Sequence, residues 1–302
     1  INLATGDATA IDELERILYN GALSGVSLAG NTYFYENPLQ AGPKRTRWAW
    51  HACPCCPPMF LKLMSALPGY IYATGDQSAL YVNLFIGSQA KLTLADTPVA
   101  ITQTTHYPWT GDVRLTISPA HAAKFDMNIR IPDWCRESSS PGGLYTWHRP
   151  AGDAFSISVN GQPIATPEIT RGYAHVSHTW SAGDVLELHL SMPPRRVVAD
   201  EHVKADRGRV ALMRGPLVYC LESIDNGGSL HDLKLPEDSP IAIEERPTLL
   251  GAVTVLHASR YRPTSDNAAA QSQITAIPYY ANANRGPVEM EVWIPANVSG
   301  VH

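Results

Sequence analysis

The feature that most restricts the fold of this chain is a change in hydrophobic periodicity near residue 75. Before it, the segment DATAIDELERILYNGAL (residues 7–23) repeats aliphatic residues every three or four positions, which predicts an amphipathic helix. The segment PPMFLKLMSALPGY (57–70) predicts a second helix, because prolines stand at its start and Pro68-Gly69 at its end. Two such helices bury little surface alone, so residues 1–74 are predicted to be the remnant of a larger helical domain.

After residue 75 the pattern becomes that of strands. Segments such as DVRLTISP, AFSISVNGQPI and DVLELHLSM are short, alternate apolar with polar residues, and are bounded by Gly, Pro, Asn or Asp. Asn160-Gly161 predicts the tight turn of a hairpin. The segment MPPRRVVADEHVKADRGR is predicted to connect two strand-rich blocks. We therefore expect a mainly β protein with β-sandwich modules over residues 75–200 and 201–302.

Composition excludes some classes of function. The net charge is −5, no basic run is interleaved with aromatic residues, and no apolar stretch reaches the length of a membrane span. These features argue against a nucleic-acid or membrane partner. The five cysteines are an odd number, which argues against a secreted disulfide framework and favours a reducing compartment, the cytoplasm over the periplasm. Because the chain opens on Ile1 in an element interior, we expect that it is part of a longer protein.

The stretch WHACPCCPPMF (50–60) places three cysteines within four positions. The prolines after Cys56 predict that this thiol lies at the start of the second helix, where the helix dipole favours a thiolate. A disulfide between the adjacent Cys55 and Cys56 would be strained. A structural zinc site needs four ligands, and no second Cys or His pair lies downstream at ligand spacing. A metal site completed by residues outside the chain is the preferred interpretation, and buried inert cysteines are the alternative.

Other candidates are less specific. Glu15 lies on the apolar stripe of the first helix, which suggests a carboxylate that is paired or used, although a helix-edge glutamate can also reach solvent. The Tyr35 hydroxyl is a candidate for a site, and an ordinary core tyrosine is the alternative. The aromatic residues beside the cysteines either stack on a sugar or pack; they are Trp48, Trp50 and His51. Five further residues are assigned to the core or to packing in the strand modules: Trp109, Trp134, Trp180, Cys135 and Cys220.

Several motifs together resemble glycoside hydrolase family 127, the β-L-arabinofuranosidases. They are, in chain order, ELERILYNGALSGVSLAGNTYFYENPL, CPCCPPMFLKLMSALPGYIY, LYVNLFIGSQAKLTL, YPWTGDVRLTI and DRGRVALMRGPLVYCLE. The resemblance implies an (α/α)6 catalytic barrel, here its C-terminal part, followed by β-sandwich domains. It also implies an L-arabinofuranose-containing oligosaccharide as substrate and a tendency to form homodimers through the C-terminal sandwich.

The resemblance further implies a zinc ion held by one glutamate and three cysteines. Cys55 matches the cysteine that is both zinc ligand and nucleophile of a retaining double displacement through a thioglycosyl intermediate, and Cys56 matches a further zinc ligand. Glu15 and Tyr35 match residues that contact the sugar. Zinc would keep Cys55 as a thiolate and make it a better leaving group in the second step.

The sequence also departs from the family pattern. The acid/base glutamate and the Glu-Thr-Cys motif with the other two zinc ligands match no residue here, so residues 1–302 alone are expected to be inactive. Met59 stands where the family usually has asparagine, and Cys53 is a thiol without an assigned role. Two other functions compete: a non-catalytic carbohydrate-binding or scaffolding fragment, and a structural metal or redox-thiol protein.

Overall fold

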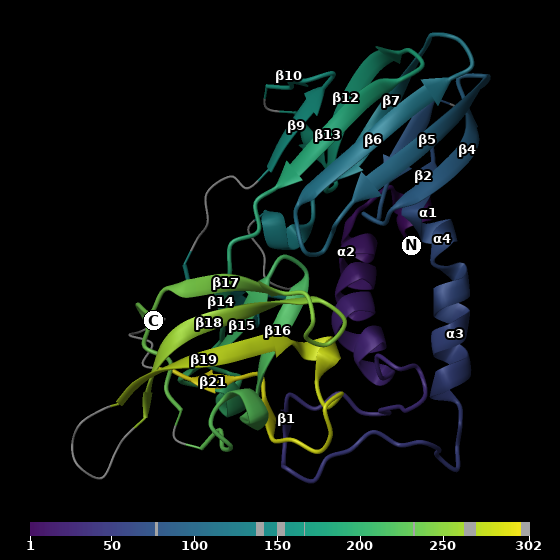
Figure 1. Ribbon diagram of the computed structural model, residues 1–302. Helices are drawn as coiled ribbons and strands as arrows, with labels where there is room; N and C mark the ends of the chain where they lie inside the picture. Colours follow the sequence, from purple (N-terminus) through teal and green to yellow (C-terminus); the bar gives the residue numbers. More distant parts are fainter. Residues whose placement is uncertain are drawn as a thin grey trace. The chain divides into compact units, whose positions relative to one another are not determined.

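The computed structural model describes residues 1–75, 78–136, 142–149, 155–165, 167–231, 233–262 and 270–296 (Figure 1). The chain forms two compact units. Unit 1 consists of Ile1–Glu15, Leu61–Glu137 and Ala151–Met192, and unit 2 of Arg16–Phe60, Ser138–Pro150 and Pro193–His302. Strands dominate both units, which confirms the mainly β class. The barrel and the three domain ranges expected from the sequence stay predictions. None of the described helices has the length and apolar character needed to cross a membrane.

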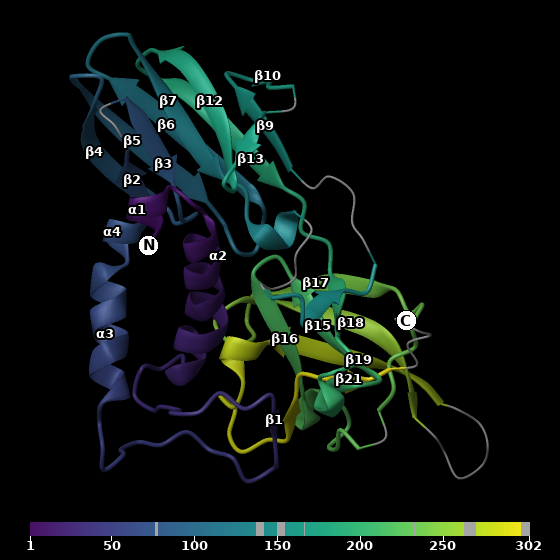
Figure 2. The same ribbon diagram turned by 180° about the vertical axis from the view of Figure 1, so that it is seen from behind.

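Unit 1 contains two sheets, which Figure 2 shows from behind. The six-stranded sheet has the order β10-β9-β13-β6-β5-β4 and is antiparallel throughout. Its strands are β4 (Ser88–Leu94), β5 (Thr97–Thr105), β6 (Asp112–Pro119), β9 (Phe155–Val159), β10 (Gln162–Pro163) and β13 (Asp184–Leu190). The five-stranded sheet has the order β11-β12-β7-β3-β2, with β3 parallel to β7. Its strands are β2 (Tyr72–Thr74), β3 (Ala79–Val82), β7 (Ala123–Arg130), β11 (Ile169–Thr170) and β12 (Tyr173–Trp180).

Alternation of apolar and polar residues forms these strands, as expected for sheets with one covered face. In β6, Val113, Leu115 and Ile117 are each at most 2% exposed, and the residues between them are more accessible. The predicted hairpin is confirmed: β9 and β10 pair around Asn160-Gly161, whose φ angles of 51° and 75° are those of a left-handed turn.

The helices are α1 (Asn2–Thr5), α2 (Thr9–Arg16), α3 (Cys56–Ala66) and α4 (Pro68–Ile71). Short 3-10 turns are Leu23–Gly25, Asp133–Cys135, Lys204–Asp206, Ser223–Asp225 and Tyr279–Ala281. The carboxylate of Asp7 accepts hydrogen bonds from the hydroxyl of Thr9 at 2.7 Å and from its backbone N–H at 2.8 Å, which lowers the pKa of Asp7 and supports the start of α2. On the apolar side of α2, Ile11 packs with Ile71 and Leu84.

The first helix differs from its prediction in one respect. It continues beyond Arg16 as a π-helical turn, Ile17–Ala22, rather than as α-helix to residue 23. The Asn20 side-chain amide donates to the Arg16 carbonyl at 3.0 Å and to the Pro216 carbonyl at 2.8 Å, and its oxygen accepts the Val218 N–H at 2.8 Å. The side chain therefore competes for the carbonyl that the Asn20 N–H would use in an α-helix.

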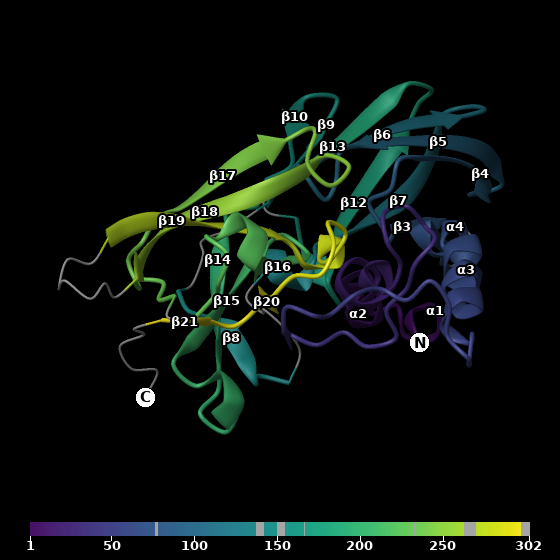
Figure 3. The same cartoon turned by 60° about the horizontal axis from the view of Figure 1, so that its bottom comes forward.

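Unit 2 is built on a ten-stranded sheet with the main order β17-β18-β19-β16-β15-β14-β8 (Figure 3). Its strands are β1 (Gln40–Ala41), β8 (Tyr145–Trp147), β14 (Arg195–Ala199), β15 (Arg209–Arg214), β16 (Leu217–Glu222), β17 (Ile241–Arg246), β18 (Val253–Arg262), β19 (Ala270–Pro278), β20 (Met290–Glu291) and β21 (Ile294–Pro295). Cys220 on β16 is 1% exposed, and in unit 1 Cys135 is 5% exposed, so their assignment to the core is confirmed. Trp134 and Trp180 are buried as well.

Alkaline solution should destabilise unit 1 through Tyr173. The Tyr173 hydroxyl donates to Asn83 at 2.6 Å and accepts from Asn2 at 2.9 Å, and burial raises its pKa to about 12. Between about pH 10 and 12 the unfolded chain would lose this proton first, so the free energy of unfolding falls by about 2–3 kcal/mol as the pH rises. Tyr173→Phe should be about 1–3 kcal/mol less stable at pH 7, because it breaks these bonds, yet lose less stability in alkali. Urea titrations across this range measure both; an identical pH dependence of the two proteins would refute the assignment.

Candidate active site

The three neighbouring thiols lie at the surface, where helix α3 begins. Cys56 is the first residue of the helix, as predicted, because Pro57 and Pro58 suit a first turn whose N–H groups need no helical partner. Cys53, Cys55 and Cys56 are all exposed, which does not fit buried inert cysteines. The Cys55 and Cys56 sulfurs lie 3.6 Å apart, so they form a thiol pair without a disulfide.

The spacing of this pair fits a zinc ion. Two thiolates bound at about 2.3 Å to one tetrahedral zinc lie about 3.8 Å apart, close to the 3.6 Å between the Cys55 and Cys56 sulfurs. Within the described residues no group of three or more His, Cys, Asp or Glu side chains converges on one point. Cys55 and Cys56 therefore supply two donors of a set that needs four.

Tyr35 lies next to the thiols in unit 2. Partial burial raises the pKa of its phenol, and the nearby Cys56, Cys55 and Cys53 sulfurs raise it further. The structure thus brings together three of the four residues expected at the site from the sequence: Tyr35, Cys55 and Cys56.

An aromatic cluster stands beside Tyr35. The ring of His51 stacks on Trp48, with centroids 4.5 Å apart and an interplanar angle of 16°, and lies 4.5 Å from the ring of Tyr35. Tyr35 and Trp48 are 5.3 Å apart, so the three rings form a triangle. Trp50 is 74% exposed and is not one of these three rings. The sequence left sugar stacking and packing open for these aromatic residues, and for His51 and Trp48 the structure shows mutual packing.

Glu15, the fourth expected residue, lies in unit 1 and is 2% exposed. Arg130 on β7 donates to its Oε1 at 2.5 Å, and the Tyr107 hydroxyl donates to the same oxygen at 2.8 Å. Its Oε2 accepts from the indole N–H of Trp134 at 3.2 Å. Glu15 is thus a paired core carboxylate, one of the two outcomes that the sequence left open.

Comparison with known proteins assigns the chain to a family. Three family models match: the GH127 catalytic domain of β-L-arabinofuranosidase at residues 1–69, its middle domain at 79–192, and the glycoside hydrolase family 127 C-terminal domain at 194–295. The chain belongs to glycoside hydrolase family 127. This family assignment confirms the resemblance seen in the motifs.

Individual relatives agree with the family 127 assignment. A non-reducing end β-L-arabinofuranosidase of Bifidobacterium longum subsp. longum is 31% identical over 93% of this chain and 44% of its own length. A solved GH127 β-arabinofuranosidase is 39% identical with a TM-score of 0.92, covering 99% of this chain and 47% of its own. The GH127 β-L-arabinofuranosidase from Geobacillus stearothermophilus T6 is 36% identical with a TM-score of 0.87, covering 97% and 47%. This family 127 chain therefore spans about half the length of these relatives.

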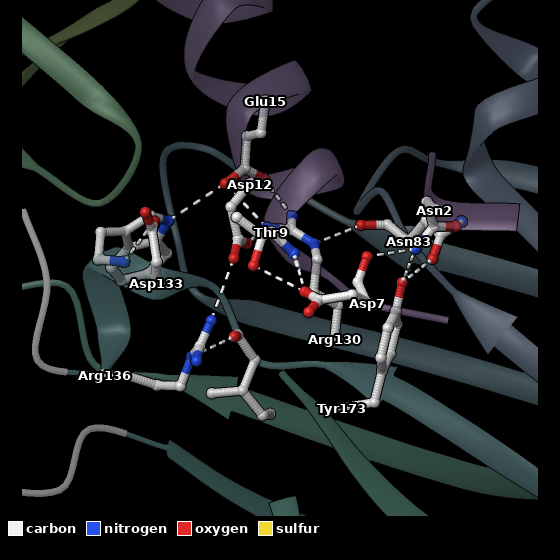
Figure 4. A network of polar contacts seen from close by, with 12 residues as sticks. Asn2, Asp7, Thr9, Asp12, Glu15, Asn83, Arg130, Asp133, Arg136 and Tyr173 are labelled. Carbon is white, nitrogen blue, oxygen red and sulfur yellow. Dashed lines mark hydrogen bonds and ion pairs between the residues drawn. The ribbon is translucent and has the colours of Figure 1, made fainter. Parts of the chain in front are cut away.

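Sequence reasoning on this family 127 chain missed the buried cation that holds α2. The Arg130 side chain is 0% exposed and donates to Asp12 at 2.7 Å as well as to Glu15, and Arg136 donates to the other Asp12 oxygen at 3.1 Å (Figure 4). Burial lowers the pKa of Arg130, but the Glu15 and Asp12 carboxylates more than offset this, so the guanidinium stays charged. Burial also raises the pKa of Asp12, against the influence of Arg130.

The alternation of residues along β7 gives a wrong prediction for the burial of Arg130. Arg130 has the parity of Asp126 and Asn128 in β7, opposite to the apolar Met127 and Ile129, so the alternation predicts that it faces solvent. It is buried because the carboxylates of α2 meet that face of the strand. Polar residues that alternate along a strand do not indicate, from one sequence, that the arginine among them is buried against carboxylates.

Proposed function

We propose that this chain forms part of a zinc-dependent retaining glycoside hydrolase that acts on L-arabinofuranose-containing oligosaccharides. The observation that carries the proposal is the exposed thiol pair at the start of α3, with its sulfurs 3.6 Å apart and Tyr35 beside it. Family membership and the arabinofuranosidases among the relatives support the choice of substrate.

In this mechanism the Cys55 sulfur attacks the anomeric carbon, and the carbon–sulfur bond forms as the bond to the leaving oxygen breaks. The leaving oxygen takes a proton from a general acid, which the family resemblance assigns to a glutamate outside residues 1–302. Water then attacks the same carbon and gives its proton to that glutamate, which now acts as a base, while the carbon–sulfur bond breaks and Cys55 returns as a thiolate. Two displacements at one carbon retain its configuration.

Other residues of the chain have supporting roles. Cys55 and Cys56 would hold the zinc ion, which supplies positive charge that keeps both sulfurs as thiolates at neutral pH. The Tyr35 phenol, which is protonated at neutral pH, would donate a hydrogen bond to a sugar oxygen. A sugar contact by Glu15 stays a prediction, and to make it the carboxylate would have to leave Arg130 and Tyr107.

We also propose that α2 and α3 belong to a larger helical domain of the (α/α)6 type. Helix α3 has no buried residue, and Met59 and Leu61 on it are 59% and 64% exposed. Apolar side chains in such number on one short helix favour burial against further helices. Because the acid/base glutamate and two zinc ligands match nothing in residues 1–302, these residues alone should not turn over substrate.

Two measurements test the proposed function. The gene product that contains residues 1–302 should release L-arabinose from β-L-arabinofuranosides with retained configuration, detected by NMR of the first-formed product, and should contain about one zinc per chain by elemental analysis. Residues 1–302 expressed alone should show neither property. An inverted product, or full activity after complete removal of zinc, would refute the mechanism. The DNA upstream of the codon for Ile1 should encode the acid/base glutamate and a Glu-Thr-Cys motif in frame.

A further inference from the structure

His51 makes contacts that the proposed mechanism does not use. Its Nδ1 lies 3.2 Å from the backbone nitrogen of Cys53 and 3.3 Å from the Cys53 carbonyl oxygen, and it accepts the Cys53 N–H when the ring proton is on Nε2. Its ring contacts those of Trp48 and Tyr35, each with centroids 4.5 Å away. One side chain thus bonds to the segment that carries the thiols and packs on the tyrosine beside them. We call residues 51–56 the thiol loop.

The thiol loop has few other anchors. Within the described residues, no backbone N–H of residues 49–53 donates to a backbone carbonyl, and the Cys53 N–H bond to His51 is the one side-chain anchor of these donors. The chain is better held at Trp48, which forms a bridge with Tyr33, with N–H···O distances of 2.8 and 2.9 Å in the two directions. The stacking of His51 on Trp48 therefore connects the start of the thiol loop to the bridge between Trp48 and Tyr33.

The same bridge leads to Tyr35. Tyr33 and Tyr35 are two residues apart in the chain. Trp48, paired with Tyr33, reaches the Tyr35 ring at 5.3 Å, and His51 fills the third corner of the triangle. The position of the Tyr35 hydroxyl and the position of the thiols are consequently linked through one imidazole.

We propose that His51 is the positioning residue of this site: its ring orients Tyr35, and its Nδ1 fixes the backbone that presents Cys55 and Cys56. This inference rests on the proposed function for the role of these three residues. A displacement of about 1 Å at reacting groups can cost about 10²-fold in rate, so a single anchor of this kind affects catalysis without touching substrate.

Two substitutions separate the two contacts. His51→Phe keeps an aromatic ring on Trp48 and Tyr35 but has no acceptor for the Cys53 N–H. His51→Asn has no ring, but its side-chain oxygen can accept the N–H of the residue two positions on, as in an Asx turn. The same substitutions at His202, an exposed histidine of unit 2 that pairs with Asp200, are the matched controls.

Two readouts are measured. The first is the ratio of alkylation rates of Cys55 and Cys56 by iodoacetamide in chelator, by peptide mass spectrometry on residues 1–302 and on the gene product that contains them. The second is kcat and KM of that gene product on a β-L-arabinofuranoside. His51→Phe should change the alkylation ratio by about three-fold and lower kcat by about ten-fold with little change in KM. His51→Asn should keep the ratio and raise KM by about five-fold, because Tyr35 loses its support.

The alkylation ratio, kcat and KM together distinguish failure of the His51 inference from failure of the proposed function. If both variants leave the alkylation ratio, kcat and KM at wild-type values, or shift all of them in parallel with Tm, the inference is overturned. If the wild-type gene product shows no glycosidase activity but His51→Phe alone changes the alkylation ratio, the proposed function fails while the anchoring of the thiols by His51 stands. If the wild type is active and the variants match it, only the role of His51 fails.

Discussion

Cys55→Ser in the gene product that contains residues 1–302 is expected to lower kcat on β-L-arabinofuranosides by about 10³-fold or more. The serine hydroxyl is a far weaker nucleophile than a thiolate near neutral pH. Because Cys55 would also be a zinc ligand, the variant should retain less zinc. Steady-state kinetics with elemental analysis of the same preparation measures both changes.

Cys53→Ser is the matched control for this result. Cys53 is an exposed cysteine of the same thiol loop, and its backbone N–H, which bonds to His51, is unchanged by the substitution. We expect kcat within about three-fold of wild type for Cys53→Ser. Cys56→Ser should lose zinc as Cys55→Ser does. A Cys55→Ser enzyme with wild-type kcat would rule out Cys55 as nucleophile.

Arg130→Met should lower the free energy of unfolding by about 3–5 kcal/mol, the largest effect on stability that we expect in unit 1. The substitution leaves the Asp12 and Glu15 carboxylates buried, at 3% and 2% exposure, without their main counterion. Arg136 contacts Asp12 but not Glu15 in these bonds and cannot replace Arg130. Urea unfolding monitored by tryptophan fluorescence measures the loss.

Unit 1 offers a matched control for burial. Arg114 and Glu187 form an ion pair of 2.6 Å between β6 and β13, but their side chains are 53% and 44% exposed. Arg114→Met should cost less than about 1 kcal/mol, since water screens the pair. Adding Asp12→Asn and Glu15→Gln to Arg130→Met should recover part of the lost stability, because the buried charges are removed. Equal losses for Arg130→Met and Arg114→Met would contradict the importance of burial.

The features that could be predicted from the sequence depend on residues that are close together in the chain. Helix α3 begins at Cys56 because prolines follow, and the hairpin at Asn160-Gly161 forms because these residues accept positive φ. The strands of both units follow from alternating residues that bury one face. At the candidate site, the proximity of Cys55 and Cys56 needs no tertiary information, because they are neighbours in the chain.

Partners distant in sequence could not be predicted from one sequence. By itself, the sequence determined the thiol pair, the start of its helix and the mainly β class, because each depends on residues a few positions apart. Only the tertiary structure decided that Glu15 is neutralised by an arginine 115 positions away, and that Tyr35 and His51 pack together beside the thiols. The physical reason is that burying a charge or a ring depends on which surfaces meet, and strand or helix periodicity specifies only which side a residue occupies.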